Sequence, residues 1–155
     1  MSMLAMDAAK RWRRVHGLIN ALSWDEFLPC IGITVESVDL PAAIPAVLVR
    51  DRVILLKRGL SRESSALLVW HEVGHVALHA GGAAFWTSSV GGQHLLRRFE
   101  RQAWTFALQF PVWQSDVLEA ALNGLASNCE IPGTLALVID DLARSSHQRT
   151  RLGLA

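Results

Sequence analysis

Two histidines and a glutamate stand close together in the most apolar part of the chain, within the stretch His71-Glu72-Val73-Gly74-His75. Side chains four residues apart project from one face of a helix, one turn apart. Two imidazoles in that arrangement can bind one zinc ion, each nitrogen about 2.0–2.1 Å from the metal. Glu72 lies about 100° around the helix from His71 and can reach a water beside the metal as a general base. The spacing therefore predicts a zinc site with a base next to it.

The alternative interpretation is an ordinary helix with partly buried histidines, because the motif by itself also arises by chance. Its setting favours the zinc site, since the flanking residues predict a buried helix: Leu67, Leu68, Val69, Val73, Val76 and Leu78. Burying two histidines and a glutamate without partners is costly, and a metal ion removes that cost. Gly74, in the helix interior, indicates the close approach of another element.

A catalytic zinc ion needs a third protein ligand, and the downstream candidates are His79, His94 and Glu100. His79 follows His75 by one turn, so it cannot close a tetrahedron from the same straight helix and is better interpreted as a supporting residue. Glu100 falls on the apolar stripe of a second helix, where a carboxylate is costly unless it is paired or ligating. Pairing with Arg97 or Arg101 is the alternative for Glu100, and His94 is the second candidate ligand.

The hydrophobic pattern predicts the elements that must position these side chains. Ser61 is the expected N-cap of the motif helix, with Glu63 in its first turn. The glycine-rich stretch 80–93 is expected to be a loop that covers the site, and the residues from about 145 are expected to fray. Expected helices span 4–22, 62–79, 94–110, 115–125 and 132–143, with Pro132 opening the last; expected strands span 31–38, 46–50 and 53–57.

The composition excludes several classes of protein. With 51% hydrophobic and 19% charged residues in 155, the chain can bury a core and is not disordered. A formal net charge of +1 demands no nucleic-acid or membrane partner. Cys30 and Cys129 are too few for a secreted disulfide framework and are expected to be reduced and buried. With no targeting segment recognised, we expect a soluble, cytoplasmic protein.

The motif residues resemble those of the ImmA/IrrE family of zinc metallopeptidases. The resemblance lies in His71-Glu72-Val73-Gly74-His75-Val76-Ala77-Leu78-His79, then Glu100-x-x-Ala103-x-x-Phe106-Ala107 and Pro111. It covers roughly residues 45–111, and it implies that Glu100 is the third zinc ligand. The chain departs from the family at Trp104, where a small polar residue is usual, and at Leu108-Gln109-Phe110, which replaces a run of aliphatic residues.

The family resemblance implies an activity and, together with the single α+β domain that the predicted elements indicate, an expected fold. The expected activity is zinc-dependent hydrolysis of a peptide bond in a regulatory protein such as a helix-turn-helix repressor, with Glu72 as the base. The expected fold is α+β: a mostly helical, zincin-like domain over residues 1–155, with a small antiparallel sheet packed on the motif helix. Its motif-bearing core spans about 45–111 and its C-terminal helices about 113–147.

Two other functions compete with the peptidase. The first is a zinc-stabilised interaction protein, such as an antirepressor, that cleaves nothing. The second is a DNA-binding regulator, suggested by the basic cluster Lys10-Arg11-Trp12-Arg13-Arg14. A solvated helix face explains that cluster better, given the nearly neutral net charge. No residue is identified as the stabiliser of the transition state; His79 and His94 are the only candidates named.

Overall fold

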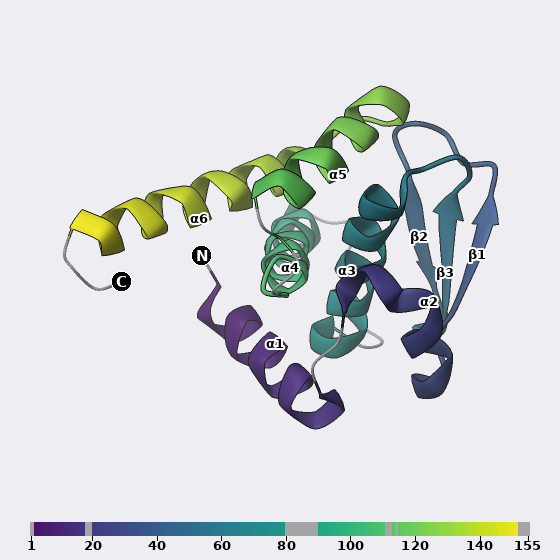
Figure 1. The fold of residues 1–155 in the computed structure, drawn as a ribbon, viewed down its shortest axis with the longest axis horizontal. Helices are drawn as coiled ribbons and strands as arrows, with labels where there is room; N and C mark the ends of the chain where they lie inside the picture. Colours follow the sequence, from purple (N-terminus) through teal and green to yellow (C-terminus); the bar gives the residue numbers. More distant parts are fainter. Residues whose placement is uncertain (1, 18–19, 80–89, 111–112, 114, 152–155) are drawn as a thin grey trace.

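Helices dominate the computed structural model, which describes residues 2–17, 20–79, 90–110, 113 and 115–151 (Figure 1). For residues 90–95, 115 and 147–151 the backbone alone is described. Six α-helices and a three-stranded sheet lie within these ranges. The helices are α1 (Met3–His16), α2 (Trp24–Phe27), α3 (Arg62–His79), α4 (Val90–Ala107), α5 (Ser115–Asn128) and α6 (Gly133–Arg151), with short 3-10 turns η1 (Ala21–Ser23) and η2 (Leu28–Ile31). The strands are β1 (Thr34–Val38), β2 (Ala46–Val49) and β3 (Val53–Lys57).

Helix α3 carries the histidine motif and is the central element of the fold. It begins as predicted, because the Ser61 side chain accepts a hydrogen bond from the backbone N–H of Ser64 at 3.1 Å. Every residue from Ser64 to His75 is buried, because α3 packs between α4 and α5, the sheet, and the N-terminal helices. Figure 1 shows α3 between the sheet and α4. A helix covered on several sides needs apolar residues around most of its circumference, and the sequence supplies them.

Gly74 marks the contact between α3 and α4, as the sequence analysis predicted. A Cβ added to Gly74 would lie 3.0 Å from the backbone oxygen of Ala103 and 3.2 Å from the Phe106 ring. The missing side chain therefore allows the two helix backbones to approach closely. This approach matters for the site, since the histidines lie on α3 and Glu100 lies on α4.

The sheet is mixed, so the prediction of an antiparallel sheet is wrong. Strands β2 and β3 form the expected antiparallel hairpin, but β1 pairs with β3 in parallel, giving the order β1-β3-β2. The hairpin turn places Arg50 and Asp51 at positive φ, 51° and 56°, as in the tight turns that match strand twist. The parallel pairing could not be read from local pattern, because β1 and β3 meet only through the tertiary fold.

The N-terminal helix is shorter than predicted. It ends at His16, before Gly17 at φ 84°, and not at residue 22. Ala5 and Ala9 are buried, whereas Leu4 and Val15 are exposed. The helix also delivers Trp12 to a cluster of aromatic rings shared with Phe27, Trp70, Phe106 and Phe110. The N-terminal segment thus packs directly on α3 and α4.

The C-terminal half contains two further corrections. Helix α6 continues to Arg151, so fraying from residue 145 is wrong, and Pro132 directly precedes the helix. Helix α4 begins at Val90, inside the predicted loop 80–93; residues 80–89 of that loop lie outside the described part of the chain. Cys129 is buried as expected, but Cys30 is exposed. Among the described residues, no helix is both long enough and apolar enough to cross a membrane.

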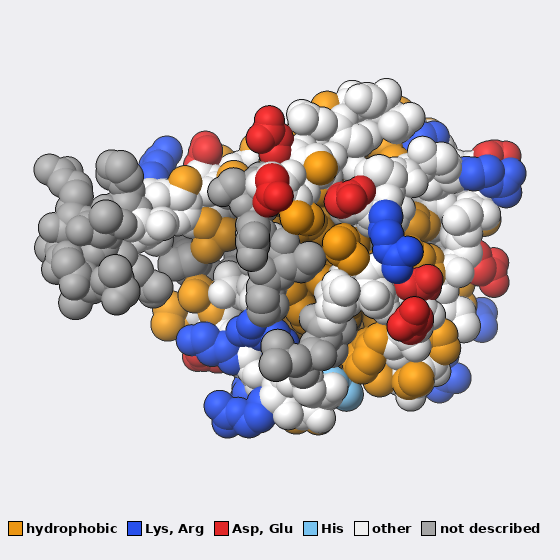
Figure 2. Space-filling model, in the orientation of Figure 1, with side chains coloured by type: hydrophobic (Ala, Val, Ile, Leu, Met, Phe, Trp, Pro, Cys, Tyr) orange, Lys and Arg blue, Asp and Glu red, His pale blue; other side chains and the backbone are white. Residues whose placement is uncertain are grey.

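The surface mixes charged and apolar side chains. Figure 2 shows acidic, basic and apolar groups interspersed on the face in view, in keeping with the small net charge of +1. Large apolar side chains that are exposed include Met3, Leu4 and Leu137.

Candidate metal centre

Helices α3 and α4 bring together the three side chains predicted to bind a metal. The two Nε2 atoms of His71 and His75 lie 3.2 Å apart. One carboxylate oxygen of Glu100 lies 3.1 Å from His71 Nε2, and the other lies 2.9 Å from His75 Nε2. Glu100 thus spans both histidines from the facing helix. The group could hold a metal ion.

The size and chemistry of this group fit a divalent metal such as zinc. Four tetrahedral ligands at about 2.0–2.1 Å from zinc lie roughly 3.3 Å from one another. The three distances between the facing atoms are 2.9 to 3.2 Å, slightly shorter than that spacing. Two imidazoles and one carboxylate are the ligands of many catalytic zinc sites, which keep a fourth position for water.

Charges within the group shift the pKa values of Glu100 and His75. Burial alone would raise the pKa of Glu100, but its contacts with His71 and His75 outweigh burial and hold that pKa well below its usual range. Burial lowers the pKa of His75, yet the hydrogen bond and charge of Glu100 raise it overall. Glu100 is therefore ionised at neutral pH, and its carboxylate charge favours a bound cation.

A chain of hydrogen bonds fixes the orientation of the His75 ring. Gln102 Oε1 lies 2.8 Å from His79 Nε2, and His79 Nδ1 lies 3.1 Å from His75 Nδ1. An amide oxygen can only accept, so His79 carries its proton on Nε2 and accepts at Nδ1. His75 then donates from Nδ1 to His79, and its Nε2 faces Glu100 and His71, where it can bind a metal once it has lost its own proton. Burial lowers the pKa of His79, which keeps that ring neutral and able to accept.

His71 is oriented differently. Its ring stacks on the Trp104 indole, with centroids 3.8 Å apart and planes 25° apart. Its Nδ1 is buried and has no hydrogen-bond partner among the described residues, and the same is true of the Trp104 indole N–H. Trp104 is one of the two places where the sequence departs from the ImmA/IrrE pattern, and here it covers one face of a candidate metal ligand.

Glu72 is buried beside the group, with only 8% of its surface exposed. Burial raises its pKa; the nearby histidines act in the opposite direction, and the Glu100 charge adds to the rise. A carboxylate with a raised pKa is a stronger proton acceptor once ionised. A cation bound between the histidines would offset part of that rise and favour the ionised form.

The structure narrows the alternatives that the sequence left open. Among the described residues, Glu100 forms no ion pair with Arg97 or Arg101: Arg101 binds Asp141 at 2.9 Å, and Glu100 contacts the two histidines. His79 lies in the supporting position expected for it, and both of its ring nitrogens are engaged. The side chain of His94 lies outside the described residues, although its backbone belongs to α4.

Two supporting residues were missed in the sequence. Gln102 was not singled out, because no local periodicity links it to His79, 23 positions earlier. Trp104 was noted for its unusual type and its place on the apolar stripe, but nothing in the sequence indicated that it stacks on His71. Both contacts depend on how α3 and α4 cross.

Comparison with known proteins found no matching family model, no matching curated protein and no matching solved structure. The geometry of the site therefore carries the functional argument.

Proposed function

We propose that this protein is a zinc-dependent metallopeptidase of zincin-like architecture. It hydrolyses a peptide bond in a regulatory protein, a helix-turn-helix repressor being the substrate that the ImmA/IrrE resemblance favours. A cytoplasmic location suits such a substrate. One observation carries the proposal: a buried glutamate, Glu72, adjoins a His71–His75–Glu100 group whose spacing suits a tetrahedral metal ion.

The chemistry divides between the metal and the protein. A zinc ion held by His71, His75 and Glu100 would lower the pKa of a water towards 7 and polarise the scissile carbonyl. Glu72 accepts the proton of the attacking water and then donates it to the leaving amine. Glu100 is the most exposed member of the group, with 30% of its side chain accessible, against 6% for His71 and 10% for His75. Water and substrate therefore approach from the side of Glu100.

Stabilisation of the transition state does not come from His79 in this scheme. Both of its ring nitrogens are committed, one to His75 and one to Gln102. The chain contains no tyrosine to supply a phenolic donor. His94 is the remaining candidate named from the sequence.

The decisive experiment is the substitution Glu72→Gln. It keeps the size of the side chain and removes the base, so bound zinc should remain while cleavage of a purified helix-turn-helix repressor slows by about 10²–10⁴-fold. Zinc content is measured by mass spectrometry and cleavage by gel electrophoresis. The matched control is Glu63→Gln, in the first turn of the same helix. Cleavage at the parent rate by Glu72→Gln would rule out the proposed mechanism.

Burial of the site favours one second candidate, a zinc-stabilised interaction protein. His71, Glu72 and His75 are each less than 9% exposed, and enclosed metal sites are typical of structural zinc. On this alternative, zinc removal abolishes binding of the partner, the partner is never cut, and Glu72→Gln has no effect on binding. Incubating the zinc-loaded protein with the repressor and checking for fragments separates the two functions.

A further inference from the structure

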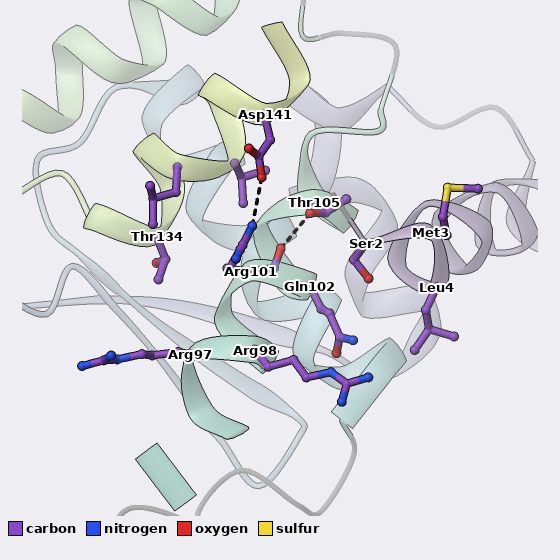
Figure 3. A pocket seen from close by; sticks show the side chains of 12 residues that line it. Ser2, Met3, Leu4, Arg97, Arg98, Arg101, Gln102, Thr105, Thr134 and Asp141 are labelled. Atoms are coloured by element: carbon purple, nitrogen blue, oxygen red, sulfur yellow. Dashed lines mark hydrogen bonds and ion pairs between the residues drawn. The ribbon is translucent and has the colours of Figure 1, made fainter. Parts of the chain in front are cut away.

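A pocket of about 670 Å³ lies between the start of α1, helix α4 and the first half of α6 (Figure 3). A volume of this size suits a small organic molecule. None of the candidate metal ligands lines it. Its lining combines arginines with apolar side chains.

Helix α4 supplies the cationic wall through Arg97, Arg98 and Arg101. Arg101 is neutralised by Asp141, 2.9 Å away across the pocket. Arg97 and Arg98 are exposed, and neither forms an ion pair with another residue in the described ranges. In Figure 3, Arg98 extends on the same side as Gln102, whereas Arg97 extends on the side of Thr134. Two positive charges therefore remain available to a ligand.

Two helix N-termini reinforce this positive character. Ser2 and Met3, at the start of α1, line one end of the pocket, and Thr134, at the start of α6, lines another. Helix N-termini carry partial positive charge and unpaired N–H groups, which favour anions. Helix dipoles and arginines thus act in the same direction at this pocket.

A buried amide lies between the cationic wall and the metal centre. Gln102 lines the pocket, yet it is only 6% exposed, and its Oε1 accepts a hydrogen bond from His79. That bond fixes the amide and leaves its NH₂ group as a preorganised donor. Within the described residues, no hydrogen bond from this NH₂ group is found.

The rest of the lining includes apolar side chains from both α1 and α6. Met3, Leu4 and Leu137 line the pocket and are among the exposed large apolar side chains of the described chain. Exposed apolar groups that gather around a pocket commonly mark a binding site. A ligand that satisfies this lining carries a negative group and an apolar body.

We propose that this pocket binds an organic phosphate. The phosphate group binds Arg98, the Gln102 amide and the N-terminus of α1, with Arg97 adding to the positive field. The apolar body of the ligand lies on Met3, Leu4 and Leu137. A phosphate dianion carries more negative charge than a carboxylate, so it gains more from its contact with Arg98 and from the positive field of Arg97. The proposal does not depend on peptidase activity.

The test uses 1-naphthyl phosphate as the probe and isothermal titration calorimetry with the full, zinc-loaded chain. We expect one binding site, with a dissociation constant at least tenfold lower than those of inorganic phosphate, 1-naphthoate and 1-naphthol. Arg98→Ala should weaken binding at least tenfold, and Arg97→Ala and Leu137→Ser should each weaken it several-fold. The thermal unfolding midpoint of each variant, measured without ligand, confirms that it is folded.

Two controls make the outcome decisive. Arg52→Ala removes the same charge from the remote hairpin and should leave binding unchanged. Glu100→Ala disrupts the metal group but not the pocket, so binding should persist. Absence of binding, equal affinity for 1-naphthoate, or loss of binding in Glu100→Ala but not in Arg98→Ala would overturn the proposal; the last result would place the phosphate on the metal.

Discussion

The two histidines of the motif occupy equivalent positions on α3, but the protein holds them by different means. His75 is oriented by a directed hydrogen-bond chain through His79 to Gln102, which fixes both its tautomer and its ring plane. His71 is oriented by stacking on Trp104, which fixes the plane alone. Hydrogen bonding from the second nitrogen is the usual support for a histidine that binds metal, and it makes the ligand more basic.

Because of this difference, the two histidines should respond to different substitutions. We call His75 with His79 and Gln102 the His75 half of the site, and His71 with Trp104 the His71 half. The His75 half depends on polar groups that must keep their protonation state. The His71 half depends on the shape of an aromatic contact between two helices. Glu100 belongs to both halves, because one carboxylate oxygen faces each histidine. Substituting Glu100 should therefore affect both halves, whereas substituting Gln102 or Trp104 should affect only one of them.

The largest effect is expected where the two halves meet. Glu100→Ala removes the group that faces both histidines, so zinc affinity should fall by more than the roughly 10–100-fold typical of supporting residues. Competition with a chromogenic chelator measures it, and Glu119→Ala, an exposed change on α5, serves as the control. Unaltered affinity in Glu100→Ala would mean that another residue completes the site.

The next effect tests the His75 half alone. Gln102→Ala breaks the hydrogen-bond chain at its far end, and zinc affinity should fall roughly 10–100-fold, the range for such supporting partners. Gln102→Glu keeps an acceptor for His79 and should retain most of the zinc affinity. The control is Gln109→Ala, just after the end of α4, which should leave zinc affinity unchanged. If Gln102→Ala and the parent bound zinc equally, the chain would not orient His75.

The third effect is the pH dependence of zinc binding. His75 must lose its proton from Nε2 to bind metal, and its pKa in the metal-free protein is raised above the ordinary value. The protonated form is therefore favoured to a higher pH than for a free histidine. Below that pKa, affinity should fall by about tenfold per pH unit. Zinc titrations from pH 8 to pH 5.5 measure the fall in affinity. In Glu100→Gln the loss of affinity should begin at a lower pH, because the charge that raises the pKa of His75 is gone. If the loss began at the same pH as in the parent, Glu100 would not be the group that raises this pKa.

The smallest effect on zinc affinity is expected from changing Trp104, which contacts His71 alone of the two histidines. Trp104→Phe keeps an aromatic face on His71 and removes a buried N–H that has no partner among the described residues. Stability should change by less than about 1.5 kcal/mol, and zinc affinity should change little. Trp104→Ala removes the stack as well and should cost about 3–5 kcal/mol of stability. Thermal and chemical unfolding compare the two; equal losses would show that stacking is unimportant.

The sequence by itself determined the local parts of this site. The four-residue spacing of His71 and His75 places them on one helix face wherever that helix forms, and Ser61 caps its start. Glu100 became a candidate because a carboxylate on an apolar stripe demands a partner, and the family resemblance favoured it over His94. Helix periodicity, capping and the β2–β3 hairpin depend on residues close together in the chain, so their signals are present in the sequence itself.

Only the tertiary structure decided what surrounds these residues. Gln102 reaches His79, Trp104 covers His71, β1 joins β3 in parallel, and α1, α4 and α6 enclose the arginine-lined pocket. Each of these contacts joins residues far apart in the chain, and none leaves a periodic pattern in it. They arise from how closely α3 and α4 approach at Gly74 and from how the remaining helices pack around that pair. The motif thus specifies the candidate ligands, whereas helix packing specifies the proton positions, the stacking and the second pocket.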